Sequence, residues 1–266
     1  MEYIELNNNI KLPMIGYGTL NLKGRECEEL VLKALNNGYR LIDTSRMYDN
    51  EVEIGRAIKK SNIKREDIFI ITKVCSLDNS YDKTLKAINS SLINLDVDYI
   101  DLVLIQEPYP NSSDMFRALE EYCFMGKIRS IGVSNYDEKY FEELLDECNI
   151  IPAIDQVEAH VFFRQKDLHE CLTNYKTIMQ AWGPLTSGIK DLSSHITLNK
   201  LAKKYNKTEY QICLRYLIQN NIMVIPGTKK EEEMIENINI FDFNIDDEDM
   251  EILSNLDDNT SLFRWY

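Results

Sequence analysis

Short apolar runs alternate along the chain with segments whose apolar residues recur three and four positions apart. Leu85, Ile88, Leu92 and Leu95 fall on one helical face, as expected of an amphipathic helix between two such runs. We interpret the runs as eight strands, at residues 14–18, 40–43, 68–73, 100–105, 130–134, 154–158, 178–182 and 223–226. The pattern therefore predicts strands and helices in regular alternation.

Other elements are predicted at both ends of this series. Residues 2–12 are typical of a hairpin, because residues 3–6 alternate, Asn7, Asn8 and Asn9 form a turn, and residues 10–12 return. Asp137 and Thr208 are helix-capping residues before predicted helices at 138–148 and 209–219. Further helices are predicted at 198–205, 230–237 and 246–255.

Eight strands that alternate with helices favour a closed parallel barrel over an open, doubly wound sheet. The Gly-rich G-x-G-x-x-G signature of a dinucleotide-binding open sheet is absent, since Gly16-Tyr17-Gly18 does not continue it. No linker-like or low-complexity tract divides the chain. We predict one domain over residues 1–266, an (α/β)8 TIM barrel with an N-terminal β-hairpin and additional C-terminal helices.

Composition narrows the possible partners and compartment. The 266 residues are 44% hydrophobic, carry a formal net charge of −14 and have a pI near 4.8, which argues against nucleic acid or an anionic membrane as partner. No apolar run approaches the ~20 residues that span a bilayer. The cysteines are scattered without a C-x-x-C spacing, and no secretory signal is recognisable. We expect a cytoplasmic monomer with reduced cysteines and no metal.

In a parallel barrel, the reacting groups lie at the C-terminal ends of the strands and in the loops that follow. The second run ends at Asp43, with Tyr48 five residues later, and the third ends at Lys73. A lysine beside a tyrosine favours its phenolate, and an aspartate keeps that lysine charged. Lowering a phenol pKa by about 3 units requires roughly 4 kcal/mol. The three side chains thus predict an acid–base site. Taken singly, Asp43 is equally explained as a turn cap and Lys73 as an ordinary ion pair.

At these residues the chain resembles the aldo-keto reductase family over nearly its whole length. The matching segments are G-Y-R-L-I-D-T-S-R-M-Y-D-N-E, I-T-K at Lys73, G-K-I-R-S-I-G-V-S-N, D-Q-V-E, A-W-G-P-L, V-I-P-G-T and I-E-N. The resemblance implies reversible, nicotinamide-dependent reduction of a small aldehyde or ketone without metal. It also implies that Tyr48 is the general acid/base, that Lys73 lowers its pKa and that Asp43 holds Lys73.

The resemblance implies a cofactor site as well. Ser134, Asn135 and Gln156 would hold the carboxamide, and Trp182 would stack on the nicotinamide ring; as an alternative, Trp182 is a core aromatic. Pro184, Leu185 and Gly188 would follow the pyrophosphate. The remaining predicted cofactor positions are Thr19, Leu20 and Asp43, together with Ile225, Gly227, Thr228, Glu236 and Asn237 towards the adenosine end.

The fourth catalytic position departs from the family pattern. The family typically has I-H-x-P after the fourth strand, whereas this chain has Ile105-Gln106-Glu107-Pro108. A glutamine amide still donates a hydrogen bond to a carbonyl, but it does not titrate near neutrality. Losing such a donor outright costs ~2.7–4 kcal/mol, and a neutral donor should cost less. We expect weakened or re-specified catalysis. The alternatives are a nucleotide-binding protein with little turnover that acts through a protein partner, and a barrel without nucleotide that acts as a scaffold or lyase.

A second departure concerns the 2′-phosphate of NADP. The family often has I-P-K-S followed by an arginine, where this chain has Gly227, Thr228 and Glu233. Glu233 suits the ribose hydroxyls of NAD, whereas Lys229 and Lys230 would restore positive charge. Family habit leaves NADP(H) slightly favoured and NAD(H) possible. The loop at 110–114 is short, so we expect an open mouth lined by Tyr17, Leu20, Arg46, Glu107, Tyr109 and residues 263–266, with Arg46 as either a substrate-carboxylate ligand or a surface ion pair.

Overall fold

The computed structural model describes residues 1–263, and its main sheet has eight parallel strands in sequential order from β3 to β10. A parallel bridge between Ile15 and Val224 joins the first of these strands to the last and closes the sheet into a barrel. The predicted barrel is therefore confirmed. The strands are β3 (Tyr17–Gly18), β4 (Leu41–Asp43), β5 (Phe69–Val74), β6 (Ile100–Ile105), β7 (Ile128–Ser134), β8 (Ile154–Glu158), β9 (Ile178–Trp182) and β10 (Met223–Ile225).

The predicted strands agree with the observed ones except at their ends and at the seam of the barrel, where the first strand meets the last. β6, β8 and β9 match the predicted ranges residue for residue. The first strand is much shorter than the predicted 14–18, because only Tyr17 and Gly18 pair with β4. The preceding residues bond to the other side of the seam, where the Gly16 amide donates to Val224 O at 2.9 Å. The segment is thus shared between two neighbours, and the apolar pattern does not reveal that division.

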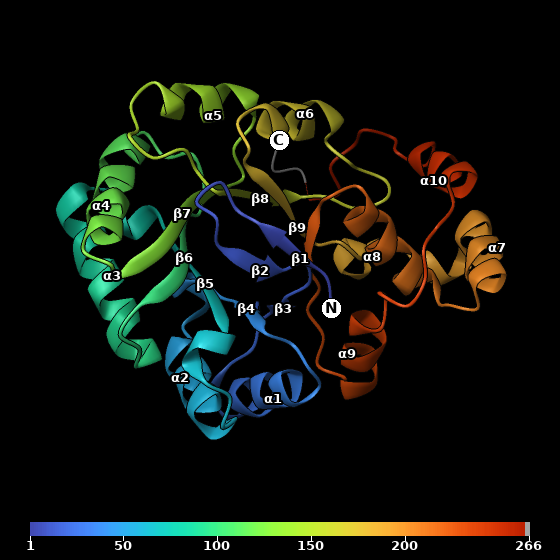
Figure 1. The fold of residues 1–266 in the computed structure, drawn as a ribbon, viewed down its shortest axis with the longest axis horizontal. Coiled ribbons are helices and arrows are strands. Elements are labelled where there is room, and N and C mark those ends of the chain that lie inside the picture. Colours follow the sequence, from blue (N-terminus) through green and yellow to red (C-terminus); the bar gives the residue numbers. More distant parts are fainter. Residues whose placement is uncertain (264–266) are drawn as a thin grey trace.

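Helices surround the barrel, as Figure 1 shows, with α7 and α10 at the periphery. The capping residues predicted from sequence cap two of them: Asp137 accepts the Tyr140 amide at the start of α5, and Thr208 forms a capping box with Gln211 at the start of α8. α5 ends three residues before the predicted Cys148. The helices are α1 (Gly24–Asn36), α2 (Glu51–Lys60), α3 (Tyr81–Leu95), α4 (Ser112–Phe124), α5 (Glu138–Leu145), α6 (Lys166–Asn174), α7 (Ile196–Tyr205), α8 (Glu209–Gln219), α9 (Glu231–Ile238) and α10 (Asp247–Ser254).

The predicted hairpin, β1 (Tyr3–Glu5) with β2 (Lys11–Pro13), lies across one end of the barrel (Figure 1). Its Leu12 belongs to the same buried cluster as Leu41, Phe69 and Met223, which are the first residues of β4, β5 and β10. The hairpin therefore closes the N-terminal end of the barrel with apolar contacts. The C-terminal strand ends, which carry the predicted site, lie at the opposite end.

Candidate active site

Asp43 and Lys73 form a buried ion pair at the C-terminal ends of β4 and β5. Lys73 Nζ lies 2.7 Å from Asp43 Oδ1 and 2.9 Å from Oδ2, and the two side chains are 1% and 6% exposed. Asp43 pairs in register with Ile71, so Lys73 lies two residues further on, on the same face of β5. The strand register therefore brings the two predicted residues together.

Lys73 uses all of its hydrogen-bond donors within this pair and the adjoining backbone. Its third contact is with Thr44 O at 2.9 Å, and a lysine ammonium has three donor hydrogens. Nζ lies 5.5 Å from the centroid of the Tyr48 ring. Lys73 thus acts on the phenol through its charge and its proximity rather than through a hydrogen bond.

Tyr48 ends the 3₁₀ turn η1 (Arg46–Tyr48) that follows β4, and its side chain is half-buried. Burial raises the pKa of Tyr48 above its ordinary value, the charge of Lys73 lowers it, Asp43 raises it, and a hydrogen bond from Gln106 lowers it. The balance is a raised pKa, whereas the sequence predicted a lowered one. The main reason is burial, which disfavours the charged phenolate, and Asp43 adds to it by offsetting part of the Lys73 charge at the phenol.

Gln106 extends β6 by one residue and faces Tyr48. Its backbone N–H donates to Val74 O at 2.9 Å, and its backbone carbonyl oxygen accepts from Asn135 Nδ2 at 3.0 Å. Its side-chain Oε1 accepts from the hydroxyl of Ser45 at 2.7 Å. Hydrogen bonds therefore fix both the backbone and the side chain of Gln106, the residue that departs from the family pattern.

The three residues predicted to hold a carboxamide come together beside this group. Ser134 and Gln156 are register partners on β7 and β8, and the Ser134 hydroxyl donates to Gln156 O at 2.8 Å. Gln156 Nε2 donates to Asp43 Oδ2 at 2.7 Å and to Gln180 Oε1 at 2.6 Å. Asn135 follows β7 in the left-handed conformation, with φ of 61°. The predicted cofactor residues are thus continuous with the acid–base pair.

Trp182 lies at the end of β9 next to these residues. Its indole N–H donates to Asn135 Oδ1 at 2.8 Å, and its ring meets the edge of Phe263 at a centroid distance of 4.9 Å. The indole is half-buried rather than enclosed in the core. Half-burial argues against a core aromatic, and the stacking role stays a prediction.

A buried carboxylate, Glu158, anchors the segment that follows α10. Its oxygens accept the Ser261 hydroxyl at 2.6 Å and the Leu262 amide at 2.7 Å, and His160 Nε2 lies 3.2 Å away. Glu158 is the register partner of Trp182, so this anchor brings Phe263 to the indole. The D-Q-V-E motif contains Glu158, but no local signal in the sequence names its distant partners.

The other predicted cofactor positions follow the strand ends around the same mouth. The Thr19 hydroxyl donates to Asp43 O at 2.8 Å, and Leu20 is 61% exposed. Pro184 and Leu185 lead from β9 into the turn η4 (Thr186–Gly188). Ile225 ends β10, and Gly227 packs so closely on Gly18 O that a Cβ would lie 3.1 Å away.

In the loop after β10, the positively charged lysines are paired with carboxylates. Thr228 Oγ1 donates to Glu233, Lys230 Nζ lies 2.8 Å from the same carboxylate, and Lys229 pairs with Glu26 at 2.7 Å. The hydrogen bonds from Lys230 and Thr228 lower the pKa of Glu233. An ionised carboxylate therefore occupies the polar contacts that a 2′-phosphate would need.

The two residues predicted at the adenosine end, Glu236 and Asn237, lie on α9 after this loop. Glu236 Oε1 accepts the Thr208 hydroxyl at 2.6 Å, so its carboxylate joins α9 to the start of α8. Asn237 is buried. Both lie in α9, about one turn beyond the ion-paired Glu233.

Arg46 is an ion-pair residue in this structure rather than a free cation at the mouth. Its Nε lies 3.2 Å from Asp78 Oδ2, and its NH1 donates to Ala87 O at 3.0 Å. The ion-pair alternative is thereby favoured over a substrate-carboxylate ligand. Of the predicted mouth residues 263–266, only Phe263 is described, and residues 264–266 lie outside the described part of the chain.

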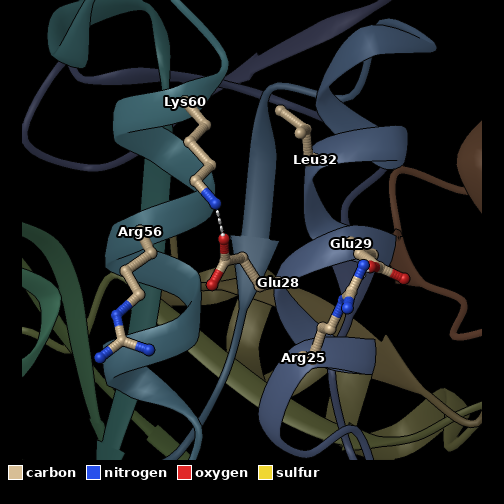
Figure 2. Close-up of a pocket in the computed structure, with 6 residues that line it drawn as sticks. All are labelled: Arg25, Glu28, Glu29, Leu32, Arg56 and Lys60. Carbon is tan, nitrogen blue, oxygen red and sulfur yellow. Dashed lines mark hydrogen bonds and ion pairs between the residues drawn. The ribbon is translucent and has the colours of Figure 1, made fainter.

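A separate pocket of about 440 Å³ lies between α1 and α2 and contains none of the predicted site residues. Figure 2 shows Lys60 reaching across it to Glu28, while Arg25 pairs with Glu29 at 2.6 Å. Its lining is Arg25, Glu28, Glu29, Leu32, Arg56 and Lys60. The charges largely neutralise one another, so we place no chemistry there.

Within residues 1–263, no group of three or more His, Cys, Asp or Glu side chains is arranged to hold a metal ion. None of the helices in that range is long and apolar enough to cross a membrane. All six cysteines lie in the described range and are free.

A parallel barrel with Asp, Tyr and Lys at successive strand ends defines the class of this protein. Residues 14–258 match the model of the aldo/keto reductase family, and the chain belongs to that family of oxidoreductases. It is 40% identical to glyoxal reductase of Bacillus subtilis (strain 168) over 252 residues, which cover 94% of this chain and 91% of the relative.

Solved structures agree with this assignment. The aldo-keto reductase MGS-M4, from a Medee basin deep-sea metagenome library, superposes with a TM-score of 0.96 at 42% identity, covering 98% of this chain and 97% of that one. The Bombyx mori aldo-keto reductase in complex with NADP superposes with a TM-score of 0.92 at 28% identity, covering 98% and 94%.

Proposed function

We propose that this protein reduces small aldehydes or ketones to alcohols, or catalyses the reverse reaction, with a nicotinamide cofactor. The observation that carries the proposal is the contiguous group of Asp43, Lys73, Tyr48 and Gln106 at the barrel mouth. Family membership supports it, as does the named activity of the glyoxal reductase relative. Small dicarbonyls and aldehydes are therefore the first substrates to test. We expect the enzyme to act as a cytoplasmic monomer.

In this proposal Tyr48 exchanges the proton with the substrate oxygen. A phenol is a weak acid, so it requires a nearby positive charge that favours the phenolate as the proton leaves. Lys73 supplies that charge from 5.5 Å, and Asp43 holds the ammonium in place. Gln106 donates a hydrogen bond at the same phenol oxygen and would offer the same amide to the substrate carbonyl. The nicotinamide, when bound, supplies or accepts the hydride.

The residues present fit the nicotinamide end of such a cofactor. Gln156 Nε2 is engaged by Asp43 and Gln180, which fixes the amide and leaves its Oε1 to accept the N–H of a carboxamide. Ser134 and Asn135 would bind beside it, and Trp182 would cover the ring. The predicted loop at 110–114 in fact overlaps the end of the segment 106–111 that joins β6 to α4, which begins at Ser112, and this short connection would leave the mouth open to substrate.

The 2′-phosphate end fits less well. NADP(H) is our expectation because the Bombyx mori neighbour is a complex with NADP, but Glu233 already holds the Thr228 hydroxyl and Lys230. A phosphate would have to displace that carboxylate or accept its repulsion. We therefore propose that NADP(H) is only slightly preferred and that NAD(H) also binds.

The direct test is to follow oxidation of NADPH and of NADH in the presence of glyoxal, methylglyoxal and simple aldehydes. Turnover with at least one carbonyl is expected. Nucleotide binding without turnover would support a nucleotide-binding protein instead, an alternative that Gln106 at the position of the family's histidine keeps open. Failure to bind either nucleotide, measured by quenching of Trp182 fluorescence, would exclude both functions.

A further inference from the structure

Ser45 is a buried residue next to the catalytic group; it lies in the matched segment that contains Asp43 and Tyr48, but the resemblance gave it no role. It lies between Asp43 and Tyr48, at the start of η1, and is fully buried. Its hydroxyl oxygen accepts the Met47 amide at 3.3 Å, which leaves the hydroxyl hydrogen to be donated elsewhere. Gln106 Oε1, 2.7 Å away, is the acceptor. Because a buried hydroxyl needs an acceptor for its hydrogen and Gln106 Oε1 lies within hydrogen-bond distance, the hydrogen bond runs from Ser45 to Gln106.

That direction decides which end of the Gln106 amide faces the phenol. A glutamine side chain has one accepting oxygen and one donating nitrogen on a torsion with two broad preferences. With Oε1 held by Ser45, Nε2 faces Tyr48, in agreement with the hydrogen bond from Gln106 that lowers the pKa of the phenol. In the opposite orientation, a carbonyl oxygen would face the developing phenolate, which would destabilise it.

The remaining freedom of Gln106 is already restricted. Its backbone N–H is bound to Val74 O at 2.9 Å, and its backbone carbonyl is bound to Asn135 Nδ2 at 3.0 Å. Neither contact distinguishes the two amide orientations. Ser45 is the contact that does.

We propose that Ser45 is a positioning residue that holds the Gln106 amide with its N–H groups directed at the Tyr48 oxygen and the substrate carbonyl. The inference rests on the proposed reductase function. It explains how a glutamine serves at the position where the family has a histidine. The Gln106 side chain supplies a directed hydrogen-bond donor that does not titrate as a histidine ring does, provided that its amide cannot rotate.

A double-mutant cycle separates this role from the capping of η1. Ser45→Ala should lower kcat about three- to tenfold, as loss of one orienting hydrogen bond predicts, with nucleotide affinity unchanged. In a Gln106→Ala background, the same Ser45→Ala change should alter kcat by less than about twofold. Equal losses in both backgrounds would show that Ser45 only caps the turn, and would overturn the proposal.

The matched control is Ser91→Ala, which removes a buried hydroxyl that has no hydrogen-bond partner on α3 and should leave kcat unchanged. If Ser45→Ala fails to fold, Ser45→Cys takes its place, because it replaces the hydroxyl with a weak donor of similar shape and should also lower kcat. It keeps the test available.

A second measurement does not depend on turnover. The side-chain amide of Gln106, assigned in the ¹H–¹⁵N spectrum by its loss in Gln106→Ala, should shift and broaden in Ser45→Ala. An unchanged amide signal would refute the positioning role even in an active enzyme. Absence of turnover in the unaltered protein, with the expected spectral change, would instead refute the reductase function and leave the Ser45 contact established.

Discussion

Replacing Lys73 with methionine should destabilise the protein strongly, because it leaves the Asp43 carboxylate buried without its counter-charge. Lys73 provides two of the hydrogen bonds to Asp43, at 2.7 and 2.9 Å, and within residues 1–263 the side-chain donor that remains on that carboxylate is Gln156 Nε2. Breaking a buried pair from one side costs about 3–5 kcal/mol. We expect the free energy of unfolding to fall by that amount at pH 7.

The comparison variant is Asp43→Asn/Lys73→Met, which removes both charges. Because replacing both partners of a buried pair is often close to neutral, its stability should return to within about 1.5 kcal/mol of the unaltered protein. Both variants should lack turnover. Lys33→Met, which breaks a half-exposed pair with Glu231, serves as the surface control and should cause no measurable change.

Urea unfolding followed by far-UV circular dichroism measures these differences, provided that the slope of the transition is unchanged. A loss below about 1 kcal/mol in Lys73→Met would refute the account of a buried, tightly coupled pair. A double variant as unstable as Lys73→Met would refute it equally, since the damage would then come from lost packing rather than from an unpaired charge.

Three further changes test separate parts of the structure. Asp155 is buried, neither of its oxygens has a well-aligned partner, and burial raises its pKa well above the ordinary value, partly offset by the Tyr136 backbone. The folded state therefore keeps a proton that the unfolded chain releases, so stability falls as pH rises above ~4, by at most about 1.4 kcal/mol per unit. Asp155→Asn should remove that loss of stability. The prediction is contradicted if the variant and the unaltered protein are equally stable at pH 4 and again at pH 7. Glu233→Gln should raise the affinity for NADPH relative to NADH about tenfold by freeing Thr228 and Lys230, measured by fluorescence titration; an unchanged ratio would contradict it. Gln106→His should raise kcat on simple aldehydes, and no gain in steady-state assays would indicate a pocket adapted to glutamine.

The architecture was largely predictable because strands buried on both faces appear as short continuous apolar runs. β6, β8 and β9 match the predicted ranges, and the residues at strand ends, Asp43, Lys73 and Gln156, meet as expected. The seam of the barrel was not predictable to the residue. At that point the same segment bonds to β10 first and to β4 afterwards, and apolar periodicity does not distinguish the two partners.

The Asp43–Lys73 pair was predictable from the sequence, whereas other contacts of the candidate site were not. The Ser45–Gln106 bond and the contacts of Glu158 with Ser261 and Leu262 join residues far apart in the sequence, and only register and backbone direction bring them together. The raised pKa of Tyr48 was missed for a related reason. Its sign depends on burial and on the Asp43 charge together, and a motif specifies neither quantity.

The central claim is that Tyr48 exchanges the proton with the substrate oxygen, and Tyr48→Phe tests it most directly. Steady-state kinetics with the best aldehyde of the panel, together with fluorescence titration of NADPH, separates chemistry from binding. We predict that kcat falls at least about 100-fold, as loss of a general acid requires, while nucleotide affinity stays within about twofold. A Tyr48→Phe protein with unchanged kcat would contradict the account.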